Sequence, residues 1–241
     1  MSTITNPIDA PAEAIACMAS LVGSLADNKA ALGQRYAEWA VSAPTLESAV
    51  AAAAMAQDEL GHARSTYPVL KALGSEGDEN AFDGARRLAL LDDELPDWAS
   101  LIAANIMIDG VLTTFVAACS GSSVTQMAQR ANKILQEEGS HRVHAEAWAR
   151  RMCRGGGQER DRFIQRLEET WCHAARWVGP NDDVGFAAAL ESGMVRKDPA
   201  SQREQVRSWL TALLAAEGAT ISLPEPEDWS GWDPARRRWE P

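Results

Sequence analysis

The segment AQDELGHAR at residues 56–64 decides the fold, because a second segment of the same form, LQEEGSHRV, occupies residues 135–143. On a helix, side chains three residues apart lie on one face, so a carboxylate and an imidazole at that spacing can bind the same ion. One such pair arises easily by chance, whereas two pairs on two helices predict the two halves of one metal site. The pairs are Glu59 with His62 and Glu138 with His141.

The sequence around these segments has helical periodicity nearly throughout and no alternating, strand-like run. Proline and glycine at Ala43–Pro44, Gly74 and residues 155–157 mark the breaks. Long helices are expected at about 10–41, 45–72, 101–119 and 124–153, and further helices near 82–91, 158–178 and 200–217. Four long helices with two Glu-x-x-His motifs predict an all-α, ferritin-like up-down four-helix bundle with additional C-terminal helices. We expect one helical domain over residues 1–223 and a Pro/Trp-rich tail over 224–241.

Composition narrows the class of protein. The chain has 241 residues, 46% apolar and 24% charged, as in ordinary soluble proteins. A net charge of −11 argues against a nucleic-acid partner. The scattered cysteines predict no disulfide frame or zinc site, and Asp9 and Glu13 stand where a signal peptide carries basic residues. These features predict a cytoplasmic protein.

Residues 101–119, LIAANIMIDGVLTTFVAAC, are apolar enough to span a membrane but carry Asp109 at their centre. A carboxylate in such a run costs several kcal/mol if it is ionised and unpaired. Between the two Glu-x-x-His helices, Asp109 is interpreted as a metal ligand from a third helix rather than as a sign of a membrane segment. Asn105 and Thr113 extend its polar stripe at i, i+4, i+8. A salt bridge to a core arginine is the alternative.

The first helix should supply a fourth carboxylate, and here the pattern departs from expectation. Counting from the turn near residue 43, the level of Glu59 falls near residues 27–31 of that helix. Glu38 is roughly 15 Å too far along the axis at 1.5 Å per residue. The residues at the right level are Asp27, Asn28 and Lys29.

Several segments together resemble the catalytic subunit of bacterial phenylacetyl-CoA epoxidase, a multicomponent ferritin-like di-iron monooxygenase family. They are AQDELGHA (56–63), IMIDGV (106–111), ILQEEGSH (134–141), WAVSAPTL (39–46) and WVGPNDD (177–183). The segment LADNKAALGQRYAEW (25–39) is more similar to the non-catalytic structural subunit of that complex, which lacks the metal ligands.

The resemblance implies a ligand set and one exception to it. Its ligands would be Glu59, His62, Asp109, Glu138 and His141, with Glu59 and Glu138 as bridges. The family's first-helix glutamate falls on Lys29. Three interpretations stay open: the Lys29 ammonium replaces one metal charge and leaves a mononuclear or metal-free site, a half-turn shift brings in Asp27, or Lys29 points to solvent.

The neighbours of these residues carry weaker signals. Asp58 and Glu137 each precede a motif histidine by four residues, and each is expected either to orient the histidine of its own helix or to lie on a solvated face. His144 is interpreted as a core or outer histidine and not as a third imidazole ligand. Five tryptophans are expected in the core or between helices: Trp39, Trp148, Trp171, Trp177 and Trp209.

Carboxylate and imidazole ligands without thiolate favour iron, two ions or one, or manganese, and O₂ as co-substrate. The resemblance implies oxygenation of a small-molecule substrate, an aromatic ring linked as an acyl-CoA thioester, and a homo- or hetero-oligomer. The chain has no dinucleotide fingerprint or clustered cysteines, so a separate electron-donating reductase is expected. Two alternatives remain: a non-catalytic scaffold subunit, and a self-modifying or iron-handling protein in which Lys29 is the candidate catalytic residue.

Overall fold

The structure of the protein, a computed structural model, describes residues 8–75 and 85–240. The elements that build the bundle are α1 (Ala12–Trp39), α2 (Leu46–Ala72), α3 (Trp98–Ala104), η2 (Asn105–Asp109), α4 (Gly110–Ala118) and α5 (Thr125–Gly155). The elements outside it are η1 (Ala89–Leu91), α6 (Gly157–Ala174), α7 (Val184–Glu191), α8 (Pro199–Ala215), β1 (Trp232–Asp233) and β2 (Arg238–Trp239). The prediction of an all-α, ferritin-like bundle is confirmed.

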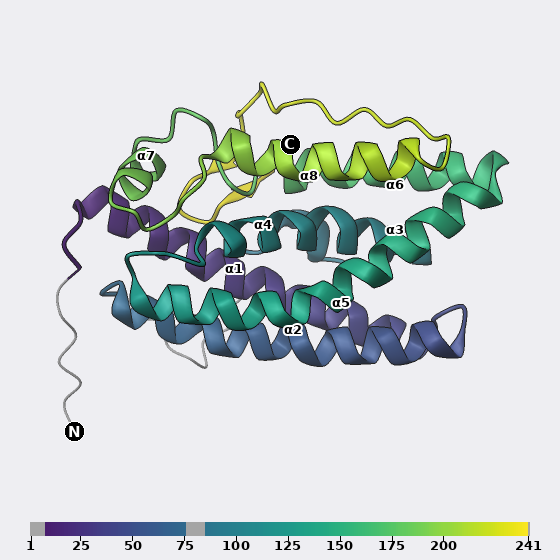
Figure 1. Cartoon of the computed structure of the whole chain (residues 1–241), viewed down its shortest axis with the longest axis horizontal. Coiled ribbons are helices and arrows are strands. Elements are labelled where there is room, and N and C mark those ends of the chain that lie inside the picture. The colour runs from purple at the N-terminus through teal and green to yellow at the C-terminus, as the bar shows by residue number, and fades with distance from the viewer. Residues whose placement is uncertain (1–7, 76–84, 241) are drawn as a thin grey trace.

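Helices α1, α2 and α5 and the segment α3–η2–α4 pack together as the bundle (Figure 1). Helices α1 and α2 form one antiparallel pair, and α5 packs against both α2 and α4. The turn between α1 and α2 is set by sequence: the Thr45 side chain accepts a hydrogen bond from the Ser48 backbone N–H at 3.2 Å and caps α2. The short α1–α2 and α4–α5 connections help to hold their helices at the common level that a shared site requires.

The central segment, α3–η2–α4, is the apolar core of the bundle. Within the described residues, this one helical stretch, Trp98–Ala118, is apolar and long enough to cross a bilayer, yet 83% of its most apolar window is buried. Its middle, Asn105–Asp109, is a π-helical turn. Such turns widen a helix locally and are frequent at functional sites. Asp109, the residue singled out from the sequence, is the last residue of this turn.

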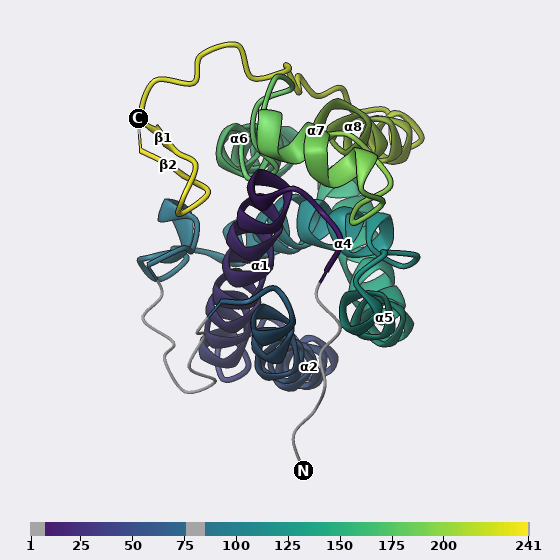
Figure 2. The same cartoon turned by 90° about the vertical axis from the view of Figure 1, so that its left-hand side faces the viewer.

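The C-terminal helices form a further layer over one face of the bundle (Figure 2). Helix α6 packs on α3, α7 on α1, and α8 on α4 and α5. The chain then runs back to the β1–β2 hairpin, where the buried Arg237 guanidinium donates to the Trp177 carbonyl at 3.0 Å and the Val178 carbonyl at 2.6 Å. This side chain fastens the tail to the body of the protein.

The sequence-based element boundaries need three corrections. Of the helix expected near 82–91, residues 82–84 lie outside the described residues, and residues 85–91 form turns and the short η1. Helix α7 was not predicted, because its small-residue sequence VGFAAALE lacks a clear polar face. The β1–β2 hairpin was also missed. The five tryptophans expected inside are confirmed, since Trp171 and Trp177 are buried and Trp39, Trp148 and Trp209 pack partly buried on the core.

Candidate metal centre

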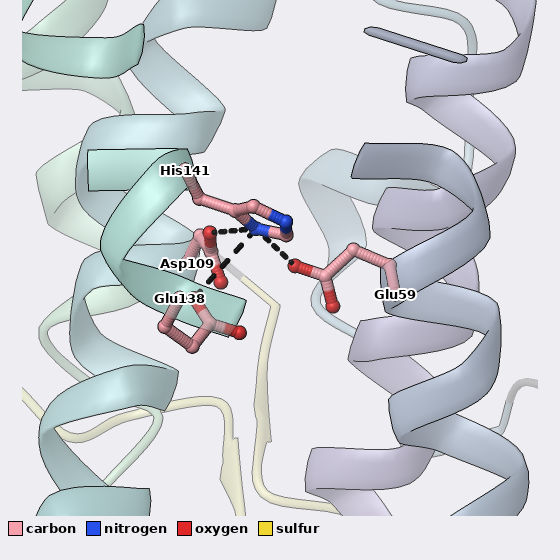
Figure 3. A group of neighbouring side chains, drawn as sticks. All are labelled: Glu59, Asp109, Glu138 and His141. Atoms are coloured by element: carbon pink, nitrogen blue, oxygen red, sulfur yellow. Dashed lines mark hydrogen bonds and ion pairs between the residues drawn. The ribbon is translucent and has the colours of Figure 1, made fainter. Parts of the chain in front are cut away.

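Three helical segments bring four ligand-type side chains together in the middle of the bundle (Figure 3). Glu59 comes from α2, Asp109 from the π-turn, and Glu138 and His141 from α5. One ligand atom of each lies within 4.8 Å of the ligand atoms of the others, and all four side chains are buried. His141 Nδ1 is 3.4 Å from Glu59 Oε1, 3.4 Å from Asp109 Oδ2 and 3.7 Å from Glu138 Oε2. Three carboxylates and one imidazole around one point form a donor set that suits a divalent ion such as Fe(II) or Mn(II).

Lys29 of α1 extends its ammonium into this group. Its Nζ lies 2.5 Å from Asp109 Oδ1, 2.5 Å from Glu138 Oε1 and 3.0 Å from Glu59 Oε1. The lysine is fully buried. The interpretation in which Lys29 points to solvent is therefore wrong, and the one in which its charge replaces a metal charge agrees with the geometry.

The buried charges balance one another. Burial opposes the charge on Lys29, but Asp109, Glu138 and Glu59 outweigh it and raise the lysine pKa well above its ordinary value. The same contact with Lys29, helped by His141, lowers the pKa of Asp109 well below its ordinary value despite burial. Burial likewise opposes the charge on the two histidines, yet the carboxylates raise the pKa of His62 to about 9 and that of His141 to about 11. Burial raises the pKa of Glu59 despite the nearby Lys29 ammonium, so the ammonium and the two histidines are what favours the charged form of this carboxylate.

His62 lies at the edge of the cluster. Its Nδ1 is 3.3 Å from Glu138 Oε1 and 3.7 Å from Glu59 Oε2. Both His62 Nδ1 and Glu59 Oε2 are buried without a hydrogen-bond partner in the described part of the chain. Two unpartnered ligand atoms facing each other fit the coordination of a cation or of a water molecule.

The outer carboxylates bind the histidines across the bundle. Glu137 Oε2 of α5 lies 2.7 Å from Nε2 of His62 on α2, and Asp58 Oδ2 of α2 lies 3.3 Å from Nε2 of His141 on α5. The prediction that each carboxylate orients the histidine of its own helix is wrong. Because α2 and α5 face each other, the side chain four residues earlier points toward the opposite helix. The crossed pairs leave both Nδ1 atoms directed inward.

The other first-helix candidates lie outside the cluster. Asp27 accepts a hydrogen bond from the Tyr67 hydroxyl at 2.7 Å and pairs with Arg86 at 3.2 Å. Asn28 accepts from the Leu88 backbone N–H at 2.8 Å. Asp27 therefore anchors the chain that follows α2, and the half-turn shift that would have brought it into the site does not occur. The rejection of Glu38 is consistent with its exposed contact to Arg35.

A cavity of about 280 Å³ reaches the cluster from the side of α8. Asp109 and Glu138 form part of its wall together with Thr113, and Trp209 of α8 borders it. The Thr113 hydroxyl donates to Glu138 Oε2 at 2.8 Å. Asn105 Nδ2 donates to Asp109 Oδ2 at 3.3 Å. The polar stripe predicted from the sequence thus lines both the cluster and this cavity.

Two further ring side chains lie near the site. Tyr36, fully buried, meets the His141 ring edge-on with ring centroids 6.4 Å apart. Tyr36 was not among the predicted site residues, although its position seven residues after Lys29 places it on the same face of α1. His144 contacts Asn105, with Nδ1 3.4 Å from the amide oxygen, and does not join the cluster.

An α-helical bundle with a buried cluster of carboxylates and histidine from facing helices defines the class of ferritin-like proteins with a carboxylate–histidine centre. Within that class, the sequence profile of the family described as "Phenylacetic acid catabolic protein" matches residues 1–241. The chain belongs to this family, as its resemblance to the components of phenylacetyl-CoA epoxidase predicted.

Two curated relatives from Escherichia coli (strain K12) are similar to the chain. It is 26% identical over 210 residues to the C subunit of 1,2-phenylacetyl-CoA epoxidase, and this match covers 84% of the chain and 82% of the relative. It is 24% identical over 149 residues to the A subunit of the same epoxidase, and this match covers 60% of the chain and 48% of the relative. The second match thus spans about half the length of that relative.

Proposed function

We propose that this protein is a metal-binding subunit of an oxygenase complex that uses iron and O₂ to oxygenate an aromatic acyl-CoA thioester. The observation that carries the proposal is the convergence of Glu59, Asp109, Glu138 and His141 within 4.8 Å in the bundle core. The relatives are named as subunits of 1,2-phenylacetyl-CoA epoxidase, which supports the reaction class, the substrate class and a hetero-oligomeric complex.

The proposed centre holds one divalent ion beside the Lys29 ammonium. The three carboxylates carry −3 and Lys29 +1, so a single divalent ion with two neutral histidines makes the cluster neutral. A second divalent ion would leave an excess of +2 on the buried groups unless Lys29 moved or two anions entered, because the outer carboxylates of Asp58 and Glu137 are 36% and 42% exposed to solvent. Uncompensated charge in a buried site is strongly unfavourable. Lys29 therefore limits the site to one ion in this proposal, and its ammonium, bound by three carboxylates, acts as a charge partner and not as a reacting group.

Bound iron would carry out the reduction of O₂, while the chain would position the ligands and exclude bulk water. Glu59, Asp109, Glu138 and His141 would hold the ion, while Asp58 keeps His141 oriented through its outer nitrogen. Thr113 fixes the Oε2 atom of Glu138 next to the cavity, which is where the reacting part of a substrate would lie. The π-turn, whose residues are all buried, would help keep bulk water away from the ion.

Electrons would come from a separate reductase. All four cysteines are free thiols, and three of them are buried. Thiolate clusters and dinucleotide-binding loops are the usual means by which one chain stores or accepts electrons. The proposed complex thus needs a second protein to supply them.

A scaffold role is a second candidate, and the Lys29 network favours it. In the metal-free state the Lys29 ammonium contacts all three buried carboxylates, and these carboxylates raise the pKa values of His62 and His141, so positive groups of the chain already offset much of the charge that a metal would balance.

Metal stoichiometry distinguishes the candidates. The protein is reconstituted anaerobically with Fe(II), with Mn(II) as competitor, and bound metal is counted after gel filtration. We expect one iron per chain for the native protein, two for Lys29→Glu, which adds the missing carboxylate, and one for the exposed control Lys133→Glu. Two irons in the native protein would refute the one-ion proposal. No iron in either the native protein or Lys29→Glu would establish the scaffold candidate instead.

A further inference from the structure

A group of aromatic side chains connects the cluster with the protein surface, and nothing in the proposed oxygenation uses it. Trp98, at the start of α3, lies at its centre. Its ring meets Trp39 of α1 at 5.7 Å, Trp148 of α5 at 5.3 Å and His144 at 6.2 Å between centroids, all edge-to-face. We call Trp39, Trp98 and Trp148 the tryptophan triad.

The triad is joined to the cluster by side-chain contacts. Asp109 accepts from the Asn105 amide at 3.3 Å, the Asn105 amide oxygen lies 3.4 Å from His144 Nδ1, and the His144 ring meets Trp98. Asn105 also lies beside the Tyr36 hydroxyl, and the Tyr36 ring meets His141. The route from the candidate ligands to Trp98 is therefore continuous.

The three tryptophans of the triad differ in their exposure to solvent. Trp98 is only 8% exposed, whereas Trp39 and Trp148 are half-buried and reach solvent. The Trp98 indole N–H has no hydrogen-bond partner in the described part of the chain. Without a hydrogen-bond acceptor among the described residues, an oxidised Trp98 would keep its proton, and the resulting cation radical would take an electron from its neighbour.

We propose that Trp98 and Trp39 of the tryptophan triad form a one-electron relay that carries electrons from a soluble reductant to the oxidised centre when O₂ reacts without substrate. This inference rests on the proposed function only for the identity of the oxidant. The centre gains one electron from Trp98, Trp98 takes one from Trp39, and the indole nitrogen of Trp39 releases its proton to water. A soluble one-electron reductant of the thiol or ascorbate class then returns the electron, and water returns the proton.

The outer carrier is Trp39 rather than Trp148. Trp39 is the last residue of α1, where unpaired carbonyls favour a nearby positive charge. Trp148 has the Arg151 guanidinium 4.8 Å above its ring, and this cation opposes formation of a second positive charge on the indole. Trp39 is thus the easier of the two to oxidise.

The first test needs no metal. In Tyr36→3-aminotyrosine, the buried ring at position 36 becomes an easily oxidised trap that a ruthenium(III) polypyridyl oxidant, produced by a laser flash in solution, cannot touch directly. We expect an aminotyrosyl radical by transient absorption and electron paramagnetic resonance. Its yield falls several-fold on adding Trp98→Phe, and falls more with Trp39→Phe than with Trp148→Phe. The matched control is Trp232→Phe, since Trp229 and Trp232 form a similar edge-on pair at 5.6 Å in the tail.

Thermal unfolding of each variant shows whether it is folded, so that a loss of radical yield caused by a missing electron carrier can be distinguished from one caused by disrupted packing. An unchanged radical yield in a folded Trp98→Phe protein would overturn the proposal, and so would an equal loss in Trp232→Phe. The second test uses iron-loaded protein exposed to O₂ and reductant without substrate. Oxidation mapped by mass spectrometry should lie at Trp39 in the native protein and move to Tyr36 and His141 in Trp98→Phe. Because the flash experiment is independent of iron, a protein that binds no iron would refute the proposed function while leaving that result to decide the relay.

Discussion

Removing the Lys29 ammonium should destabilise the metal-free protein strongly and make its stability depend on metal. The variant Lys29→Met nearly keeps the length of the side chain and removes the charge. Three carboxylates at 2.5, 2.5 and 3.0 Å lose their partner, and all the side chains are at most 4% exposed. Breaking a buried ion pair from one side costs about 3–5 kcal/mol, whereas an exposed pair contributes at most about 1 kcal/mol. For a chain of this size that loss corresponds to a fall in melting temperature of about 6–20 °C.

Urea unfolding of chelator-treated protein, with and without Fe(II), measures this effect. Bound metal should restore the stability of Lys29→Met, because the ion binds only the folded state and supplies the missing positive charge. The variant should also become more stable as pH falls, because its unpaired carboxylates take up protons more readily in the folded than in the unfolded state. The control Lys133→Met should unfold like the native protein. A metal-free Lys29→Met protein within about 1 kcal/mol of the native one would show that the ammonium does not balance the cluster.

Three further predictions concern the surroundings of the cluster and the tail. Glu137→Gln, which removes the outer carboxylate of His62, should weaken metal binding in the Lys29→Glu background by about 10–100-fold in a competition assay, and no change would contradict the crossed arrangement. Burial, and then the charge of His141, lowers the pKa of His144 to about 4. The folded protein therefore loses stability as pH falls from the ordinary histidine pKa toward about 4, because the unfolded chain takes up this proton first. An NMR titration of the His144 ring with a midpoint near the ordinary histidine pKa would contradict the lowered pKa. Gly179→Ala should lower the free energy of unfolding by about 2–5 kcal/mol, because residue 179 has φ +91° and an added Cβ would collide with Arg237 Nη2. Gly218→Ala is the control in the same urea assay: its φ is +71° but its Cβ would meet open space, so the loss should be only about 1–2 kcal/mol.

Much of the fold and of the cluster follows from periodicity and spacing alone. Glu-x-x-His places two side chains on one face of a helix, and counting residues from the α1–α2 turn puts the level of Glu59 on α1 near residues 27–31, the range that contains Lys29, its partner in the structure. Rise per residue is nearly constant, so levels can be predicted along straight helices. The π-turn at Asn105–Asp109 could not be predicted in this way, because it depends on packing against neighbouring helices rather than on local propensity.

Rotation about the helix axis is the quantity that spacing leaves undetermined. Asp58 precedes His62 by four residues, which fits a contact within α2, yet its carboxylate lies against His141 of α5. The same uncertainty left Asp27 and Lys29 as equal candidates on α1, although only Lys29 turns toward the cluster. The neighbouring side chains determine which residue faces the cluster. Arg86 and Tyr67 bind Asp27 away from it, while three buried carboxylates attract the Lys29 ammonium.

The crossed histidine pairs link the metal chemistry to the packing of the bundle. Asp58 and Glu137 each tie α2 to α5 through a histidine whose other nitrogen faces the cluster. A metal ion held by His141 would require a neutral imidazole, with Asp58 as the acceptor of its remaining N–H, so metal binding would change the charge that holds the two helices together. Lys29, on α1, contacts carboxylates of α2, η2 and α5 at once. The site therefore depends on the relative placement of all four bundle segments, and a change at any one of them should alter both metal affinity and stability.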